Sequence, residues 1–136
     1  MTAHKLAVEY MKKAITRLEV LEFFLKKEDY SDVIREAQEV VELAQKAMLR
    51  QIGIDPPKWH DVGGIILEHM EKFPEEVHKD LPEIAEVSKW LRKERELSFY
   101  GDIDFIPSEE YTHADALKAI EGAKKVVEVA RKLIKI

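Results

Sequence analysis

The sequence contains no cysteine, and this absence excludes three kinds of chemistry. The chain can form no disulfide bond, bind no zinc ion through thiolates and use no thiol as a nucleophile. Asparagine is also absent and glutamine occurs only three times, while lysine and glutamate are abundant. Few heat-labile amides together with many ionic residues are typical of proteins from thermophiles, and we expect such a source.

Long apolar runs are missing too. No segment approaches the roughly 20 apolar residues that span a membrane, and residues 1–5 lack the apolar core of a signal peptide. We therefore expect a cytoplasmic protein with no membrane partner. The net charge of −5 argues against general nucleic-acid binding by electrostatics, which needs a basic excess or a concentrated basic face.

The chain does contain helical periodicity, and no stretch shows the alternation of a strand. Its 136 residues, 46% of them hydrophobic, can bury one core, so we expect a single domain over 1–136. The predicted helices are four long ones, over 3–26, 32–51, 82–99 and from Thr112 to the end, and a shorter one after Asp61. Amphipathic helices bury their apolar faces by packing together. The predicted fold class is all-α, an up-and-down four-helix bundle with an additional short helix.

Local signals mark where these helices begin and end. Asp29 or Ser31 can cap the second helix and Gly53 can close it. We interpret Asp61 as the cap of the short helix and His60 as its neighbour in the loop, rather than as a catalytic pair. Thr112-x-x-Asp115 resembles a capping box, with aspartate in place of glutamate.

One charged residue interrupts a predicted apolar face. In the helix over 82–99 that face carries Ile84, Val87, Ser88, Leu91, Arg95 and Ser98. An arginine among buried side chains needs a partner, because the guanidinium group keeps its charge. The acidic candidates for a structural ion pair are Glu36, Asp102 and Asp104. The alternative is that Arg95 faces a cleft and binds a phosphate through two hydrogen bonds.

Several motifs follow one another in a defined order along the chain. They are Val41-Glu42-Leu43-Ala44-Gln45-Lys46-Ala47-Met48-Leu49, then Gly53, then His60-Asp61-Val62-Gly63, and finally Arg95 with Tyr100-Gly101-Asp102. In order and spacing they resemble the HEPN family (higher eukaryotes and prokaryotes nucleotide-binding). The resemblance implies a homodimeric helical bundle that is associated with nucleotide or RNA. For many members it also implies a minimal nucleotidyltransferase as partner, in a toxin–antitoxin-like pair.

Some members of the family are metal-independent ribonucleases that use an Arg-x(4–6)-His motif. Arg95 matches the arginine, but Tyr100 stands where the histidine would be, and the next histidine is His113. Tyrosine has an ordinary pKa of about 10 and is a poor general base near neutral pH. A ribonuclease would therefore need another acid–base group. A binding module and a purely structural dimerisation bundle are the other two hypotheses.

The candidate site residues cluster around the end of the predicted helix over 82–99. Arg95 and Tyr100 are the catalytic candidates, and Arg92, Arg95, Tyr100 and Asp102 are the ligand-binding candidates. Tyr100 could contact a ligand or be modified by a nucleotidyltransferase, or it could simply cover the end of the core. We expect no cofactor.

Two further patterns have a structural interpretation. Glu75-x-x-His78 and Glu110-x-x-His113 resemble carboxylate-bridged metal motifs, but neither lies within a long helix, so we predict no metal site. Glu42 and Lys46 have the spacing of an ion pair on a helix, on a face that the short helix or a second subunit could partly cover.

Overall fold

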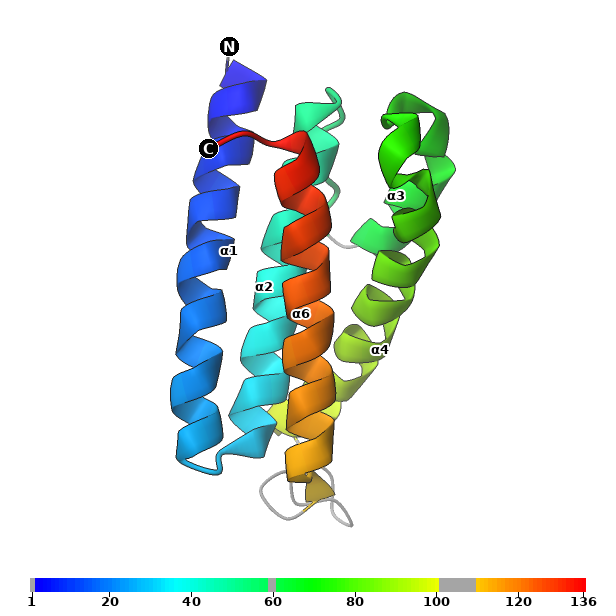
Figure 1. The fold of residues 1–136 in the computed structure, drawn as a ribbon. Helices are drawn as coiled ribbons and strands as arrows, with labels where there is room; N and C mark the ends of the chain where they lie inside the picture. The colour runs from blue at the N-terminus through cyan, green and yellow to red at the C-terminus, as the bar shows by residue number, and fades with distance from the viewer. Residues whose placement is uncertain (1, 59–60, 101–109) are drawn as a thin grey trace.

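The structure is a computed structural model that describes residues 2–58, 61–100 and 110–136, with the backbone alone for residues 2 and 95–100. In this part of the chain four long helices run alternately up and down (Figure 1). They are α1 (Thr2–Lys26), α2 (Tyr30–Gln51), α4 (Leu81–Tyr100) and α6 (His113–Leu133). The shorter elements are α3 (Val62–Glu68) and two 3-10 turns, η1 (Met70–Lys72) and η2 (Glu75–Asp80). This arrangement confirms the predicted fold class.

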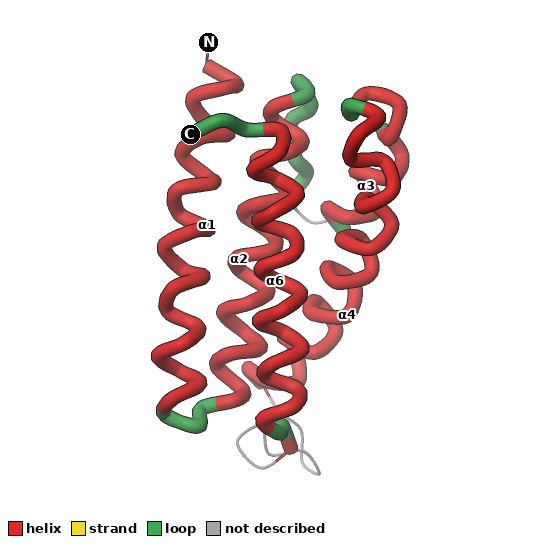
Figure 2. Tube along the Cα trace, in the orientation of Figure 1, coloured by secondary structure: helices red, strands yellow, loops and turns green. Residues whose placement is uncertain are grey.

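Helix α2 is central, because it packs against α1, α4 and α6. The described residues form no strand, and Figure 2 shows helices joined by short connections. The largest fully buried apolar side chains come from α1, α2, α3 and α4 and from the residue that follows α6, among them Met11, Leu21, Ile34, Met48, Leu49, Ile66, Ile84, Leu91 and Ile134. Within the described part of the chain, no helix is long and apolar enough to cross a membrane.

Most of the predicted helix ends are confirmed. The backbone N–H of Gly63 donates to Asp61 Oδ1 at 3.1 Å, and Thr112 and Asp115 form a reciprocal capping box. Gly53 follows α2 with a φ of 86°, a left-handed conformation that glycine adopts without strain. The predicted side-chain cap of α2 is wrong. The helix begins at Tyr30, and Asp29 lies at the N-cap position without making a side-chain cap bond.

The apolar faces of α4 and α6 also match the prediction where side chains are described. Ile84, Ser88 and Leu91 are buried on α4, and Ala116, Ile120, Ala123, Val127, Ala130 and Ile134 are buried at α6 and its end. The side chains of Arg95 and Ser98 lie outside the described residues.

A buried carboxylate ties η2 to α6. Asp80 is 5% exposed and lies 3.3 Å from Lys125 Nζ and 3.4 Å from Lys132 Nζ. Burial by itself would raise the pKa of Asp80, but the hydrogen bonds and charges of the two lysines outweigh it and lower the pKa. Asp80 therefore remains ionised and holds η2, the turn that precedes α4, against α6.

Candidate functional site

The predicted site residues belong to the second half of α4 and to the segment after it. Arg92 is half-buried, and Arg95 lies one turn further along the same helix, about 60° away around its axis. Tyr100 is the last residue of α4, about 140° around the axis from Arg95. The helix thus brings positions 92 and 95 together and sets position 100 apart. Asp102 lies outside the described residues.

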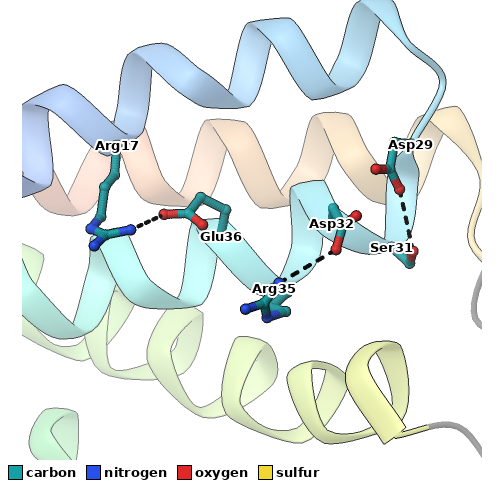
Figure 3. A network of polar contacts seen from close by, with 6 residues as sticks. All are labelled: Arg17, Asp29, Ser31, Asp32, Arg35 and Glu36. Carbon is teal, nitrogen blue, oxygen red and sulfur yellow. Dashed lines mark hydrogen bonds and ion pairs between the residues drawn. The ribbon is translucent and has the colours of Figure 1, made fainter.

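A buried hydrogen bond fixes the register between α2 and α4. Gln45 Nε2 donates to the carbonyl oxygen of Ile84 at 3.1 Å. The two helices are antiparallel (Figure 1), and Arg35 precedes Gln45 by as many residues as Glu94 follows Ile84. Arg35 is therefore level with the turn of α4 that carries the predicted arginines. Figure 3 shows its side chain on the side of α2 that faces α4.

Polar residues continue along this side of α2. Arg35, Gln38, Glu42 and Gln45 recur at intervals of three or four, and we call them, with Arg92 and Arg95 of α4, the α2–α4 seam. Gln38 Nε2 donates to Glu42 Oε1 at 3.2 Å, and Lys46 Nζ lies 3.7 Å from Glu42 Oε2. The predicted Glu42–Lys46 ion pair is thus confirmed. Helices α3 and α4 pack against α2, and Leu49 is buried there.

Two buried acceptors in the seam, the side-chain oxygens of Gln38 and Gln45, have no partner among the described residues. Gln38 is 3% exposed, and its Oε1 forms no hydrogen bond. The register places Gln38 level with Leu91, beside Arg92 in sequence. A buried unsatisfied amide oxygen costs about 1–3 kcal/mol, so a donor that reached it would be bound favourably.

A tyrosine outside the predicted site joins α4 to the start of α6. The Tyr111 hydroxyl lies 2.9 Å from the carbonyl oxygen of Glu94 and 3.1 Å from its Oε1. Burial raises the pKa of Tyr111 and the negative charge of Glu94 adds to the effect, so the hydroxyl keeps its proton as a donor. The position before an N-cap favours a residue packed on the helix, which could have predicted its burial but not its contact with Glu94.

Near the beginning of α2, the carboxyl group of Asp32 lies close to that of Asp29. Hydrogen bonding with Asp29, then burial and the Asp29 charge, raise the pKa of Asp32 to about 6, although Arg35 acts to lower it. Arg35 Nη1 lies 3.7 Å from Asp32 Oδ1, and Ser31 Oγ donates to Asp29 Oδ1 at 3.5 Å (Figure 3). The seam thus ends beside a carboxyl group whose pKa is raised to about 6.

The acidic residues predicted as partners of Arg95 are distributed differently. Glu36 Oε1 accepts from Arg17 Nη1 at 2.7 Å and points toward α1. Asp102 and Asp104 lie outside the described residues, as does His60. His78 Nε2 lies 2.8 Å from the Phe73 carbonyl oxygen, and the His113 ring packs edge-on to Tyr30. The described side chains include no group of three His, Asp or Glu arranged to hold a metal ion.

These observations define an all-helical bundle with a charged seam between its second and fourth helices. The family model for the HEPN domain matches residues 7–133, and the chain belongs to this family. It is similar to a protein of Methanocaldococcus jannaschii named "Putative toxin MJ1304". The two are 29% identical over 138 residues, which cover 96% of this chain and 90% of the relative.

Proposed function

We propose that this chain is a nucleotide- or RNA-associated HEPN module of a toxin–antitoxin-like pair, with a minimal nucleotidyltransferase as its partner. The similarity to the protein named "Putative toxin MJ1304" supports the proposal, because it extends over nearly the whole of both chains. We further propose that the module acts in the cytoplasm as a homodimer of single-domain subunits; of these properties, the homodimer is the one that the family resemblance implies.

The α2–α4 seam is where this module binds phosphate. Arg92 and Arg95 occupy successive turns of α4, and Arg35 lies across from them on α2. Guanidinium groups bind phosphate oxygens through paired hydrogen bonds, and several arginines in a partly buried seam match the charge of a nucleotide or RNA backbone. Tyr100 and Asp102 follow these arginines in the sequence, and their part in ligand binding stays a prediction.

One observation carries this assignment: the unpartnered oxygen of Gln38 lies in the same seam as the arginines. A buried acceptor of this kind fits a ligand that brings N–H or O–H donors together with phosphate, as nucleotides do. A purely structural ion pair between Arg95 and a carboxylate would leave the Gln38 oxygen without an assigned hydrogen-bond donor.

The proposal is tested by expressing the chain in a bacterial host and following growth. We expect wild type to slow growth, Arg95→Ala to relieve the effect, and co-expression of a minimal nucleotidyltransferase from the same genome to restore growth. Arg131→Ala is the matched control, because Arg131 is an exposed arginine on α6. Unimpaired growth with wild type accumulating to the level of the variants would contradict the toxin–antitoxin role.

A further inference from the structure

The outer side of the bundle carries a second basic surface, away from the α2–α4 seam. A groove of about 470 Å³ runs along α1 and is lined by Lys12, Lys13, Thr16, Arg17, Val20 and Glu36. All but Glu36 come from α1, and the five α1 residues are exposed. Figure 1 places α1 and α4 on opposite sides of the bundle, so this groove is separate from the seam.

An ion pair holds one arginine of the groove in place. Arg17 Nη1 lies 2.7 Å from Glu36 Oε1, while 48% of the Arg17 side chain remains accessible to solvent. Figure 3 shows the guanidinium of Arg17 directed toward Glu36 on α2. Guanidinium has five N–H donors, and the carboxylate uses only part of this fork. Arg17 can therefore bind a second anion with little loss of side-chain freedom.

The charge of α1 differs in sign from that of the whole chain. The chain has 22 lysines and arginines against 27 acidic residues. Helix α1 has an excess of cations: Lys5, Lys12, Lys13, Arg17 and Lys26 against Glu9, Glu19 and Glu22. A local excess of cations on an otherwise acidic protein favours the binding of phosphates at this helix rather than elsewhere on the surface.

Exposed apolar side chains extend the same face of α1. Lys13, Thr16, Val20 and Phe23 recur at intervals of three or four and so share one side of the helix axis, and Lys27 follows in the turn after α1. Phe23 is 57% exposed and Val20 is 37% exposed, and Lys27 Nζ lies 5.6 Å from the centre of the Phe23 ring. Cations beside an accessible aromatic ring are the combination that binds single-stranded nucleic acid.

We propose that this face of α1 binds single-stranded RNA, with Lys12, Lys13 and Arg17 on the phosphates and Phe23 stacked on a base. The inference rests on the RNA association proposed above and adds a surface that directs RNA along the outside of the bundle. An acidic peptide would satisfy the cations as well, but it would leave the exposed ring of Phe23 without a stacking partner. The aromatic residue therefore favours RNA.

The test is fluorescence anisotropy with a labelled oligouridylate of about 12 nucleotides, a length in the range of single-strand sites. Arg17→Gln and Phe23→Ala should each weaken binding about tenfold, the effect of one charge-assisted hydrogen bond or one stacked base. Lys13→Gln should lower the slope of log K against log salt by about 0.7. The controls are Arg131→Gln and Leu117→Ala, which change an exposed arginine and an exposed apolar residue on α6.

The possible outcomes separate this inference from the proposed function. If wild type binds RNA and Arg17→Gln and Phe23→Ala bind it as tightly as their controls, the α1 surface is overturned while the seam stands. If wild type binds no RNA, the α1 surface and the RNA association of the seam are both overturned, and a free nucleotide is the only ligand left for the seam. If a polyglutamate peptide displaces the RNA and binds with the same loss in Arg17→Gln but none in Phe23→Ala, the groove recognises acidic protein and the RNA assignment is wrong.

Discussion

The hydroxyl of Tyr111 lies 2.9 Å from the backbone carbonyl oxygen of Glu94, and this contact joins the start of α6 to the second half of α4. Tyr111 is 8% exposed, so the contact is shielded from water. Glu94 is the residue immediately before Arg95, and the hydrogen bond therefore holds the turn on which the proposed phosphate site depends.

Removing this hydroxyl should destabilise the protein modestly. Tyr111→Phe keeps the ring but loses the hydrogen bond to Glu94, which we expect to cost about 1 kcal/mol. Urea denaturation measures the free energy of unfolding. Tyr10→Phe is the matched control, because it removes the hydroxyl of a tyrosine that is only half-buried on α1. An equal loss of unfolding free energy in Tyr111→Phe and Tyr10→Phe would contradict a specific role for the hydrogen bond between Tyr111 and Glu94.

The two glycines at the start of α3 should respond oppositely to alanine. A Cβ at Gly63 would lie 3.0 Å from the Cα of Ala85, and this backbone atom cannot easily move. We expect Gly63→Ala to destabilise the protein by about 1–3 kcal/mol. A Cβ at Gly64 meets only Asp61 at 3.4 Å, so Gly64→Ala should stabilise the helix by about 0.4–1 kcal/mol. Thermal unfolding of the two variants compares them directly, and a stabilising Gly63→Ala would show that α3 and α4 do not approach so closely.

The pKa of Asp32 should depend on Asp29. Because the Asp32 carboxyl has a pKa of about 6 in the folded protein, the native state binds more protons than the unfolded chain between about pH 4 and 6. Stability contributed by Asp32 is therefore present at low pH and is lost as the pH rises through 6. In Asp29→Asn, carboxyl NMR titration should show the pKa of Asp32 falling toward its ordinary value. Asp55→Asn, which changes a carboxylate that is 97% exposed beyond the other end of α2, should leave it unchanged.

The local features of the fold could be predicted from the sequence. Three confirmed features depend on residues that lie within a few positions of one another. They are the capping box of Thr112 and Asp115, the cap at Asp61 and the buried apolar face of α6. Helical periodicity records such relations directly. The side-chain cap of α2 was predicted wrongly, because Asp29 and Ser31 bond with each other rather than with the helix backbone.

The relations between helices could not be predicted in the same way. Periodicity shows which face of a helix is apolar, but it does not give the register of two helices that pack together. Arg35 and Glu36 are neighbours in sequence, yet one points toward α4 and the other binds Arg17 on α1 (Figure 3). The α2–α4 seam and the unpartnered Oε1 of Gln38 depend on that register, so the sequence could not predict them. Arg95 lies within α4 as predicted, whereas Tyr100 is the last residue of α4 and was predicted to follow a helix that ends at residue 99. The roles of both residues stay predictions.

The central claim is that Arg95 contributes to binding RNA phosphate rather than to holding the bundle together. The most direct test measures the binding and cleavage of labelled single-stranded RNA by wild type and Arg95→Ala, with folding followed by circular dichroism. We predict that Arg95→Ala keeps the helical spectrum and melting temperature of wild type and binds RNA about tenfold more weakly. Equal RNA binding by the two proteins, or unfolding of Arg95→Ala, would contradict the account.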